Sequence, residues 1–238
     1  MADQAARART RLRLLLINPN TSVHITERLV ASARLAMAPG DELTAITATQ
    51  GPAVVRSADD LRAADANSID LAARHAPGHD GIVLGISLDG AAGRLRSLHP
   101  RLPVVGMTEA ALLAACLSHR SIGLLTLGPN LLPLYRQRVE QVCLTARVIA
   151  YEAPEMDQAF EPARAGVDTA VLAALVQAGE RLITHGAQSI VLAGAVLCGY
   201  AEAIEVACRV PVFDGVTCAV RQVREQLNTR IWSYLHAG

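Results

Sequence analysis

The stretch LLLINPNTSVHITERL (14–29) joins an aliphatic run to a polar turn and then to a helical pattern, and the chain carries a second version of it. That second copy is IGLLTLGPNLLPLYRQRV (122–139), in which Asn130 matches Asn20. Two further blocks recur in the same order, namely HDGIVLGISLDGAA (79–92) as AQSIVLAGAVLCGY (187–200), and LPVVGMTEAALLAA (102–115) as VPVFDGVTCAVRQV (210–223). The three offsets are 110, 108 and 108 residues, and this spacing predicts one structural unit present twice.

Within each half, short runs of Leu, Ile and Val alternate with longer stretches of helical periodicity. The runs that we expect to be buried strands are 12–17, 81–84, 104–105, 122–126, 190–192 and 210–213. The stretches that we expect to be helices are 22–37, 58–75, 109–118, 131–142, 167–185 and 217–227. Strands that alternate with helices predict an α/β protein with parallel sheets and right-handed crossovers.

The duplication predicts two pseudo-symmetric lobes, each a parallel sheet flanked by helices, with a cleft between them. We expect an N-terminal tail over 1–11, a first lobe over 12–107 plus 215–238, and a second lobe over 108–214. Ligands of open α/β sheets bind outside the carboxyl ends of the strands. The functional residues are therefore expected directly after the aliphatic runs.

Composition excludes several classes of function. All 22 basic residues are Arg, so a Lys Schiff base and the Lys of a phosphate-binding loop are ruled out. The formal net charge is zero, so the chain lacks the excess of basic residues that is typical of a nucleic-acid-binding protein. The five cysteines are scattered without a metal-ligand spacing, and we expect reduced thiols, a cytoplasmic location, no metal, no cofactor and no membrane segment.

The polar turn after the first strand is the first candidate binding site. Asn18, Asn20, Thr21 and Ser22 open a helix, whose free amide groups and positive dipole end suit a carboxylate or a carbonyl oxygen. A plain turn with an N-cap explains the same residues. Further candidate substrate-binding residues stand at the other strand ends: Gly85, Ser87, Thr108, Thr126, Ala195 and Val196.

The segments LLINPNTS (15–22) and TQGPA (49–53) resemble the opening of hydantoin racemases in the aspartate/glutamate racemase superfamily, and VVGMTEAA (104–111) and VPVFDGVTCAV (210–220) resemble later segments of that family. The resemblance covers about residues 14–227. It implies two similar α/β lobes with the active site between them, and racemisation next to a carbonyl without a cofactor. It further implies two cysteines, one from each lobe, that act as base and acid on opposite faces of the substrate.

The repeat places those two cysteines at Ile86 and Gly194, which lie 108 residues apart after equivalent strands. Neither residue can carry a proton, so the chain departs from the family at both catalytic positions. This departure puts the two-thiol mechanism in doubt.

Three other proton carriers near strand ends are candidates for catalysis: Asp89, Glu109 and Cys198. Each also has a structural interpretation. Asp89 suits a turn or a helix cap, and Glu109 suits the first turn of a helix because the helix dipole favours a carboxylate there. Cys198 suits a small buried core residue.

Three functions remain open. The first is a hydantoin-racemase-like isomerase that moves a proton next to the carbonyl of a small amino-acid derivative or cyclic amide, and we adopt it as the family-level interpretation. The second is a decarboxylase or lyase that uses related carbanion chemistry without paired thiols. The third is a relative that binds a small carboxylate or cyclic amide without turnover. We also expect a homo-oligomer, because apolar helical surface is abundant.

Overall fold

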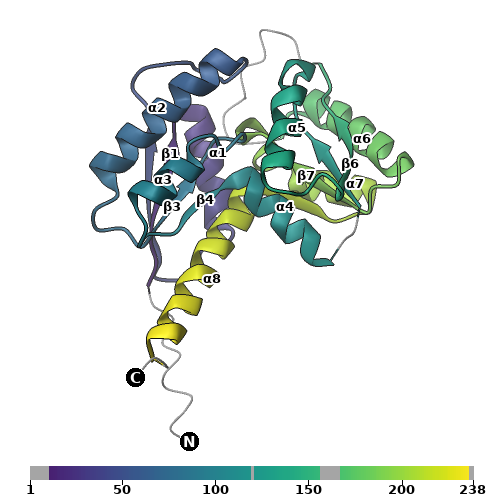
Figure 1. The fold of residues 1–238 in the computed structure, drawn as a ribbon. Coiled ribbons are helices and arrows are strands. Elements are labelled where there is room, and N and C mark those ends of the chain that lie inside the picture. The colour runs from purple at the N-terminus through teal and green to yellow at the C-terminus, as the bar shows by residue number, and fades with distance from the viewer. Residues whose placement is uncertain (1–10, 119–120, 156–166, 236–238) are drawn as a thin grey trace, which may run out of the picture.

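Two parallel four-stranded sheets form the framework of the protein in a computed structural model that describes residues 11–118, 121–155 and 167–235 (Figure 1). The first sheet has the order β2-β1-β3-β4 and the second has the order β6-β5-β7-β8. The strands of the first sheet are β1 (Arg13–Asn18), β2 (Glu42–Thr47), β3 (Gly81–Leu84) and β4 (Val104–Gly106). Those of the second are β5 (Ile122–Leu125), β6 (Val148–Glu152), β7 (Ser189–Leu192) and β8 (Val212–Asp214). The identical strand order confirms the predicted two-lobed α/β fold.

Helices connect these strands in each half. The first half contains α1 (Val23–Arg34), α2 (Ala58–His75), α3 (Ala92–Leu98) and α4 (Met107–Ser118). The second half contains η1 (Pro129–Leu131), α5 (Leu132–Gln141), α6 (Thr169–Thr184), η2 (Ala195–Leu197), α7 (Ala201–Cys208) and α8 (Gly215–Leu235). No helix of the described residues has the length and apolar character that a membrane span needs.

The buried side chains separate the two faces of each sheet. On β1, Leu14 and Leu16 belong to a cluster that runs between the two sheets, whereas Leu15 and Ile17 pack toward α2 and α3. A third cluster fills the space between the second sheet and helices α6 and α7. Alternate residues of a strand point to opposite faces, so a continuous aliphatic run is what a sheet covered on both faces requires.

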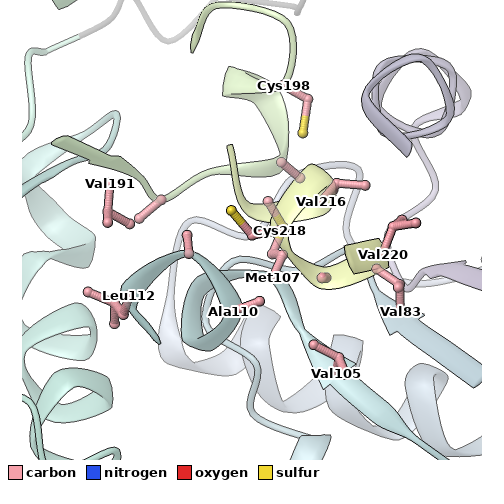
Figure 2. Packing of buried hydrophobic residues seen from close by; sticks show 14 of the residues in the cluster. Val83, Val105, Met107, Ala110, Leu112, Val191, Cys198, Val216, Cys218 and Val220 are labelled. Atoms are coloured by element: carbon pink, nitrogen blue, oxygen red, sulfur yellow. The ribbon is translucent and has the colours of Figure 1, made fainter. Parts of the chain in front are cut away.

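The cluster between the sheets joins the two halves of the chain. Figure 2 shows Val83 and Val105 of the first sheet in one cluster with Val191 of the second, with residues of α4 and α8 between them. Helix α4 follows β4 of the first sheet yet packs against β7 and β8, and α8 follows β8 yet packs against β3 and β4. Each sheet is therefore covered on this side by a helix that extends from the end of the other sheet.

The two exchanged helices meet at their first residues. Met107 begins α4 and Gly215 begins α8, and these residues are 108 positions apart, as the repeat requires. A Cβ atom at Gly215 would lie 2.8 Å from the carbonyl oxygen of Met107, closer than such atoms approach. Glycine is thus required at this crossing point.

Several elements differ from the sequence prediction. Strands β2 and β6 were not predicted, because these edge strands are only partly buried and lack the aliphatic runs of the inner strands. The short helices α3 and α7 were also missed, and α4 and α8 each begin two residues earlier than expected. The predicted lobe boundaries at 107/108 and 214/215 stay a prediction, and most of the predicted 1–11 tail lies outside the described residues.

Candidate active site

A cavity of about 780 Å³ lies between the two sheets at the carboxyl ends of their strands. Both halves of the chain line it, as expected for a ligand site in an α/β protein. From the first half the lining residues are Asn20, Ile25, Val54, Val55, Arg56, Gly85, Ile86 and Ser87. From the second half they are Thr126, Leu127, Gly128, Pro129, Asn130, Leu131, Tyr135, Glu155, Gly194, Ala195 and Val196.

The polar turn after β1 is held by its own side chains. The buried side-chain nitrogen of Asn18, Nδ2, donates hydrogen bonds to Asn20 Oδ1 (3.0 Å), the Ser22 carbonyl oxygen (3.0 Å) and Thr26 Oγ1 (2.9 Å). Ser22 caps α1 by accepting a hydrogen bond from the Ile25 amide. Of the four predicted binding residues in this turn, only Asn20 lines the cavity. Asn18 and Ser22 instead fix the shape of the loop that presents it, and Thr21 N donates to the carbonyl oxygen of Pro52 (3.0 Å).

Ile86 and Gly194 line the same cavity from the two lobes, after β3 and β7 respectively. The side chain of Ile86 is almost completely buried. At these two positions the cavity therefore presents a hydrocarbon side chain and a bare backbone. Neither position offers a group that can hold or release a proton.

A hydroxyl cluster forms one polar wall. Tyr135, which is buried on α5, lies with its hydroxyl 2.6 Å from Ser87 Oγ and 2.9 Å from the Ala193 carbonyl oxygen, and its single O–H hydrogen is shared between these two acceptors. Burial raises the pKa of Tyr135 to about 12, whereas its hydrogen bonds with Ser87 and Thr126 act in the opposite direction. The phenol therefore stays protonated at neutral pH and remains a hydrogen-bond donor.

The loop after β7 adds backbone donors. Ala195 and Val196 begin the short helix η2, and both line the cavity. Neither amide N–H donates a backbone hydrogen bond within the described part of the chain. Unpaired N–H groups at a cavity wall are suited to bind a carbonyl or carboxylate oxygen.

Asp89 and Glu109 do not line the cavity but form an ionic cluster behind it. Asp89 is completely buried and accepts hydrogen bonds from the amides of Thr108 (3.3 Å) and Glu109 (2.8 Å), at the start of α4. Its Oδ2 atom lies 3.6 Å from Nε of Arg138. Nη2 of Arg138 also pairs with Oε2 of Glu109, at 2.6 Å. Burial raises the pKa of Asp89 to about 7, against the effect of the Arg138 charge. Thr108, a predicted binding residue, is buried beside this cluster and donates to the Ser87 carbonyl oxygen.

Cys198 is buried at the end of η2 and does not line the cavity. Its carbonyl oxygen accepts a hydrogen bond from Nη1 of the buried Arg28 (3.0 Å). Burial, followed by the nearby Asp214 carboxylate, raises the pKa of the Cys198 thiol well above its usual value. The thiol is therefore kept neutral, which disfavours it as a nucleophile or base.

The structure thus brings together Asn20, Gly85, Ser87, Thr126, Ala195 and Val196 of the predicted binding residues, with Ile86 and Gly194. Sequence reasoning missed Tyr135, Asn130 and Glu155. Asn130 was detectable because the repeat pairs it with Asn20. Tyr135 gave no signal, since it lies within a helix and away from a strand end. Among the described residues, no group of three or more His, Cys, Asp or Glu side chains has the geometry to hold a metal ion.

Two like parallel sheets with a shared cavity at their carboxyl ends define a duplicated, two-lobed α/β protein. The chain matches the model of the Asp/Glu/hydantoin racemase family over residues 14–223. It is 30% identical to a hydantoin racemase from Paenarthrobacter aurescens, over 88% of this chain and 89% of that protein. The chain therefore belongs to the Asp/Glu/hydantoin racemase family.

Solved structures agree with this assignment. Allantoin racemase from Klebsiella pneumoniae is 26% identical with a TM-score of 0.82, covering 92% of this chain and 88% of that one. Allantoin racemase from Pseudomonas fluorescens is 25% identical with a TM-score of 0.81, covering 92% of each chain. The resemblance to hydantoin racemases is confirmed, and these homologues support a racemase-like function over the decarboxylase, lyase and non-catalytic alternatives.

Proposed function

We propose that this protein is a racemase-like enzyme that moves a proton at a carbon next to the carbonyl of a small cyclic amide or amino-acid-derived carboxylate, without a cofactor. The observation that carries the proposal is the cavity shared by the lobes, which is lined by the hydroxyl-bearing residues Ser87 and Tyr135 and by Ala195 and Val196, whose amides donate no backbone hydrogen bond among the described residues. The hydantoin and allantoin racemases to which the chain is similar support the same reaction class.

Removal of a proton next to a carbonyl leaves negative charge on the carbonyl oxygen. Hydrogen-bond donors that already point at that oxygen lower the barrier, because they need no reorganisation when the charge develops. Tyr135 supports this role indirectly, because its raised pKa keeps it protonated at neutral pH and its O–H is directed to Ser87 Oγ and the Ala193 carbonyl oxygen. The O–H of Ser87 is thereby left to donate to the ligand oxygen. The amides of Ala195 and Val196 are fixed donors of the same kind.

The proton carrier is the part of the mechanism that differs from a thiol pair. Asp89, Glu109 and Cys198 remain predictions for this role, and none of them lines the cavity. The contacts of Asp89 and Glu109 favour a positioning role at the start of α4. We therefore expect Cys198→Ala to keep at least half of the wild-type rate, because its buried thiol lies away from the ligand cavity.

Hydrogen exchange in deuterated water tests the proposal. The protein is incubated separately with 5-methylhydantoin, allantoin and alanine, and loss of the α-hydrogen and optical rotation are followed beside heat-denatured protein. We expect exchange faster than in the denatured control for at least one substrate, together with inversion. No exchange above that control, or release of carbon dioxide in place of exchange, would show that the proposal is wrong.

A cytoplasmic location and a homo-oligomeric state belong to the same proposal. The five cysteines are unpaired, as is usual for proteins of reducing compartments. Exposed Leu35, Leu117 and Val206 offer apolar surface for contact between subunits. Light scattering after size-exclusion chromatography is expected to give a mass above that of one chain.

A further inference from the structure

The cavity carries one positive and one negative side chain, and they come from opposite lobes. Arg56 lies in the loop between β2 and α2, and Glu155 follows β6. The other described residues that line the cavity carry no formal charge. A ligand in this cavity is therefore exposed to a cation on one lobe and to an anion on the other.

The loop that carries Arg56 is fixed to its surroundings. The Arg56 amide donates to Asp60 Oδ2 (2.9 Å) at the start of α2. The side chain of Asn67 on α2 donates to the carbonyl oxygens of Gln50 (2.8 Å) and Pro19 (3.0 Å). The loop is thereby tied both to α2 and to the polar turn after β1, so the backbone of Arg56 has a defined place at the cavity.

Glu155 has a comparable attachment on the other lobe. The backbone N–H of Thr126 donates to the carbonyl oxygen of Glu152 (2.9 Å). The backbone N–H of Gly128 donates to the carbonyl oxygen of Pro154 (3.1 Å). Thr126 and Gly128 both line the cavity. The backbone that leads to Glu155 is thus held against the same wall.

Neither charge is neutralised by the part of the chain that the structure describes. No ion pair within 4.0 Å and no side-chain hydrogen bond joins the Arg56 guanidinium or the Glu155 carboxylate to another described residue. A guanidinium presents a planar set of N–H donors that matches a carboxylate, and a carboxylate accepts hydrogen bonds from N–H groups. Both groups are available to a ligand that carries the complementary chemistry.

We infer that Arg56 and Glu155 select a ligand that has a free carboxylate at one end and an N–H donor at the other, that is, an open-chain amino-acid derivative rather than a neutral cyclic amide. The inference deepens the proposed function and rests on it in taking this cavity as the ligand site. The carboxylate faces Arg56, and the amine or ureido N–H faces Glu155. The hydroxyl and amide groups that line the same cavity are left for the central part of the ligand.

Calorimetric titration with a matched pair of ligands tests the inference. N-carbamoylalanine and 5-methylhydantoin share one carbon skeleton, but only the open-chain compound has a carboxylate. We expect the wild-type protein to bind N-carbamoylalanine at least about tenfold more tightly, as expected for one charge-assisted hydrogen bond. Because Arg56 and Glu155 are exposed, this preference is expected to weaken as salt is raised.

Charge-removing variants separate the two roles. Arg56→Gln is expected to abolish the preference for N-carbamoylalanine while leaving the affinity for 5-methylhydantoin unchanged. Glu155→Gln is expected to weaken binding of N-carbamoylalanine by about tenfold, but not of butyrate, which has a carboxylate and no N–H group. Arg94→Gln and Glu202→Gln are matched controls, because these exposed residues lie outside the cavity lining.

Equal or tighter binding of 5-methylhydantoin, no detectable binding of either ligand, or unchanged selectivity in Arg56→Gln would overturn the inference. Binding is measured separately from hydrogen exchange. Selective binding of N-carbamoylalanine without hydrogen exchange would therefore contradict the proposed function and leave the ligand class standing. Hydrogen exchange of 5-methylhydantoin alone would support the proposed function and contradict the ligand class.

Discussion

At the scale of single residues, Ile86 and Gly194 distinguish this chain from a two-thiol racemase. The resemblance to hydantoin racemases together with the repeat indicated both positions, and the structure places both in the wall of one cavity. Their neighbours Ser87 and Ala195 line the same cavity and are the donors that the proposed function assigns to a carbonyl oxygen. Under that proposal, the site has donors for the developing charge but no thiol at the two positions expected to move the proton.

Restoring both thiols is the direct test of that interpretation. We expect the double variant Ile86→Cys with Gly194→Cys to racemise 5-methylhydantoin at least about a hundredfold faster than the parent, because it would add a proton carrier on each face of the substrate. Each single variant would add a carrier on one face only and is expected to show little gain. Polarimetry measures the rate.

The double variant Ile86→Ser with Gly194→Ser is the control for the change in side-chain size. A Cβ at Gly194 would lie 3.2 Å from the side chain of Leu197, which can move aside, so the protein is expected to fold. A folded cysteine variant that is no faster than its serine control would show that the rest of the cavity no longer supports racemisation.

At the scale of secondary-structure elements, two acids with raised pKa values, the buried Asp89 and the partly buried Asp65, lie beside the starts of helices α4 and α3. Asp89 binds the first amides of α4. Asp65 on α2 lies against the turn before α3, where a Cβ atom at Gly90 would clash with Asp65 Oδ2. The Oδ1 atom of Asp65 is buried without a partner in the described structure. Burial raises the pKa of Asp65 to about 6, which is above the value of about 3.9 for an unfolded chain.

The shift at Asp65 predicts a specific pH dependence. Between about pH 4 and about pH 6 the folded protein holds a proton that the unfolded chain releases, so the contribution of Asp65 to the free energy of unfolding falls as pH rises and is constant above that window. Asp65→Asn is expected to remove this fall and to stabilise the protein by about 1 kcal/mol at about pH 8, allowing for partial solvent exposure. Urea unfolding at about pH 4 and at about pH 8 measures both values.

Asp70→Asn is the control on the same helix, since Asp70 is exposed and pairs with Arg74. We expect no comparable gain from it. If Asp65→Asn and the wild-type protein lost stability equally over the pH window, the buried carboxylate would not be the cause.

The strands and helices differ in how well they could be predicted from the sequence. The inner strands and long helices were predictable, because strands buried on both faces require continuous aliphatic runs. The edge strand β2 was not, since its residues ELTAIT mix polar and apolar side chains on a partly buried edge. Similarly, the strand-end rule found Ser87 and Ala195 but not Tyr135, whose hydroxyl reaches the cavity from within α5 through tertiary packing.

At the scale of the whole molecule, the packing of α4 against α8 joins the lobes, and Gly215 permits a close approach of their first residues. Gly215→Ala would place a Cβ 2.8 Å from the backbone oxygen of Met107. The backbone must then shift, and we expect a loss of about 1–3 kcal/mol in the free energy of unfolding. Chemical denaturation followed by circular dichroism gives this value.

Gly93→Ala is the matched control, because Gly93 lies in α3 and an added Cβ there would meet nothing within 4 Å. Alanine favours a helix over glycine by up to about 1 kcal/mol, so this variant is expected to be as stable as the wild-type protein or more stable. Equal behaviour of the two variants would contradict a special role for the Gly215 contact.

The exchange of α4 and α8 has a consequence for how such a chain arose. A solitary first half would leave the aliphatic side chains of β3 and β4 on this face in water, because the helix that covers them, α8, extends from the opposite half. Two identical half-length chains that exchanged these helices would have formed a domain-swapped, symmetric homodimer. Fusion of two tandem copies of the gene would then have joined both halves in one chain. Once linked, the copies were free to drift apart, so that one bears Arg56 and the other Glu155 at a single ligand cavity.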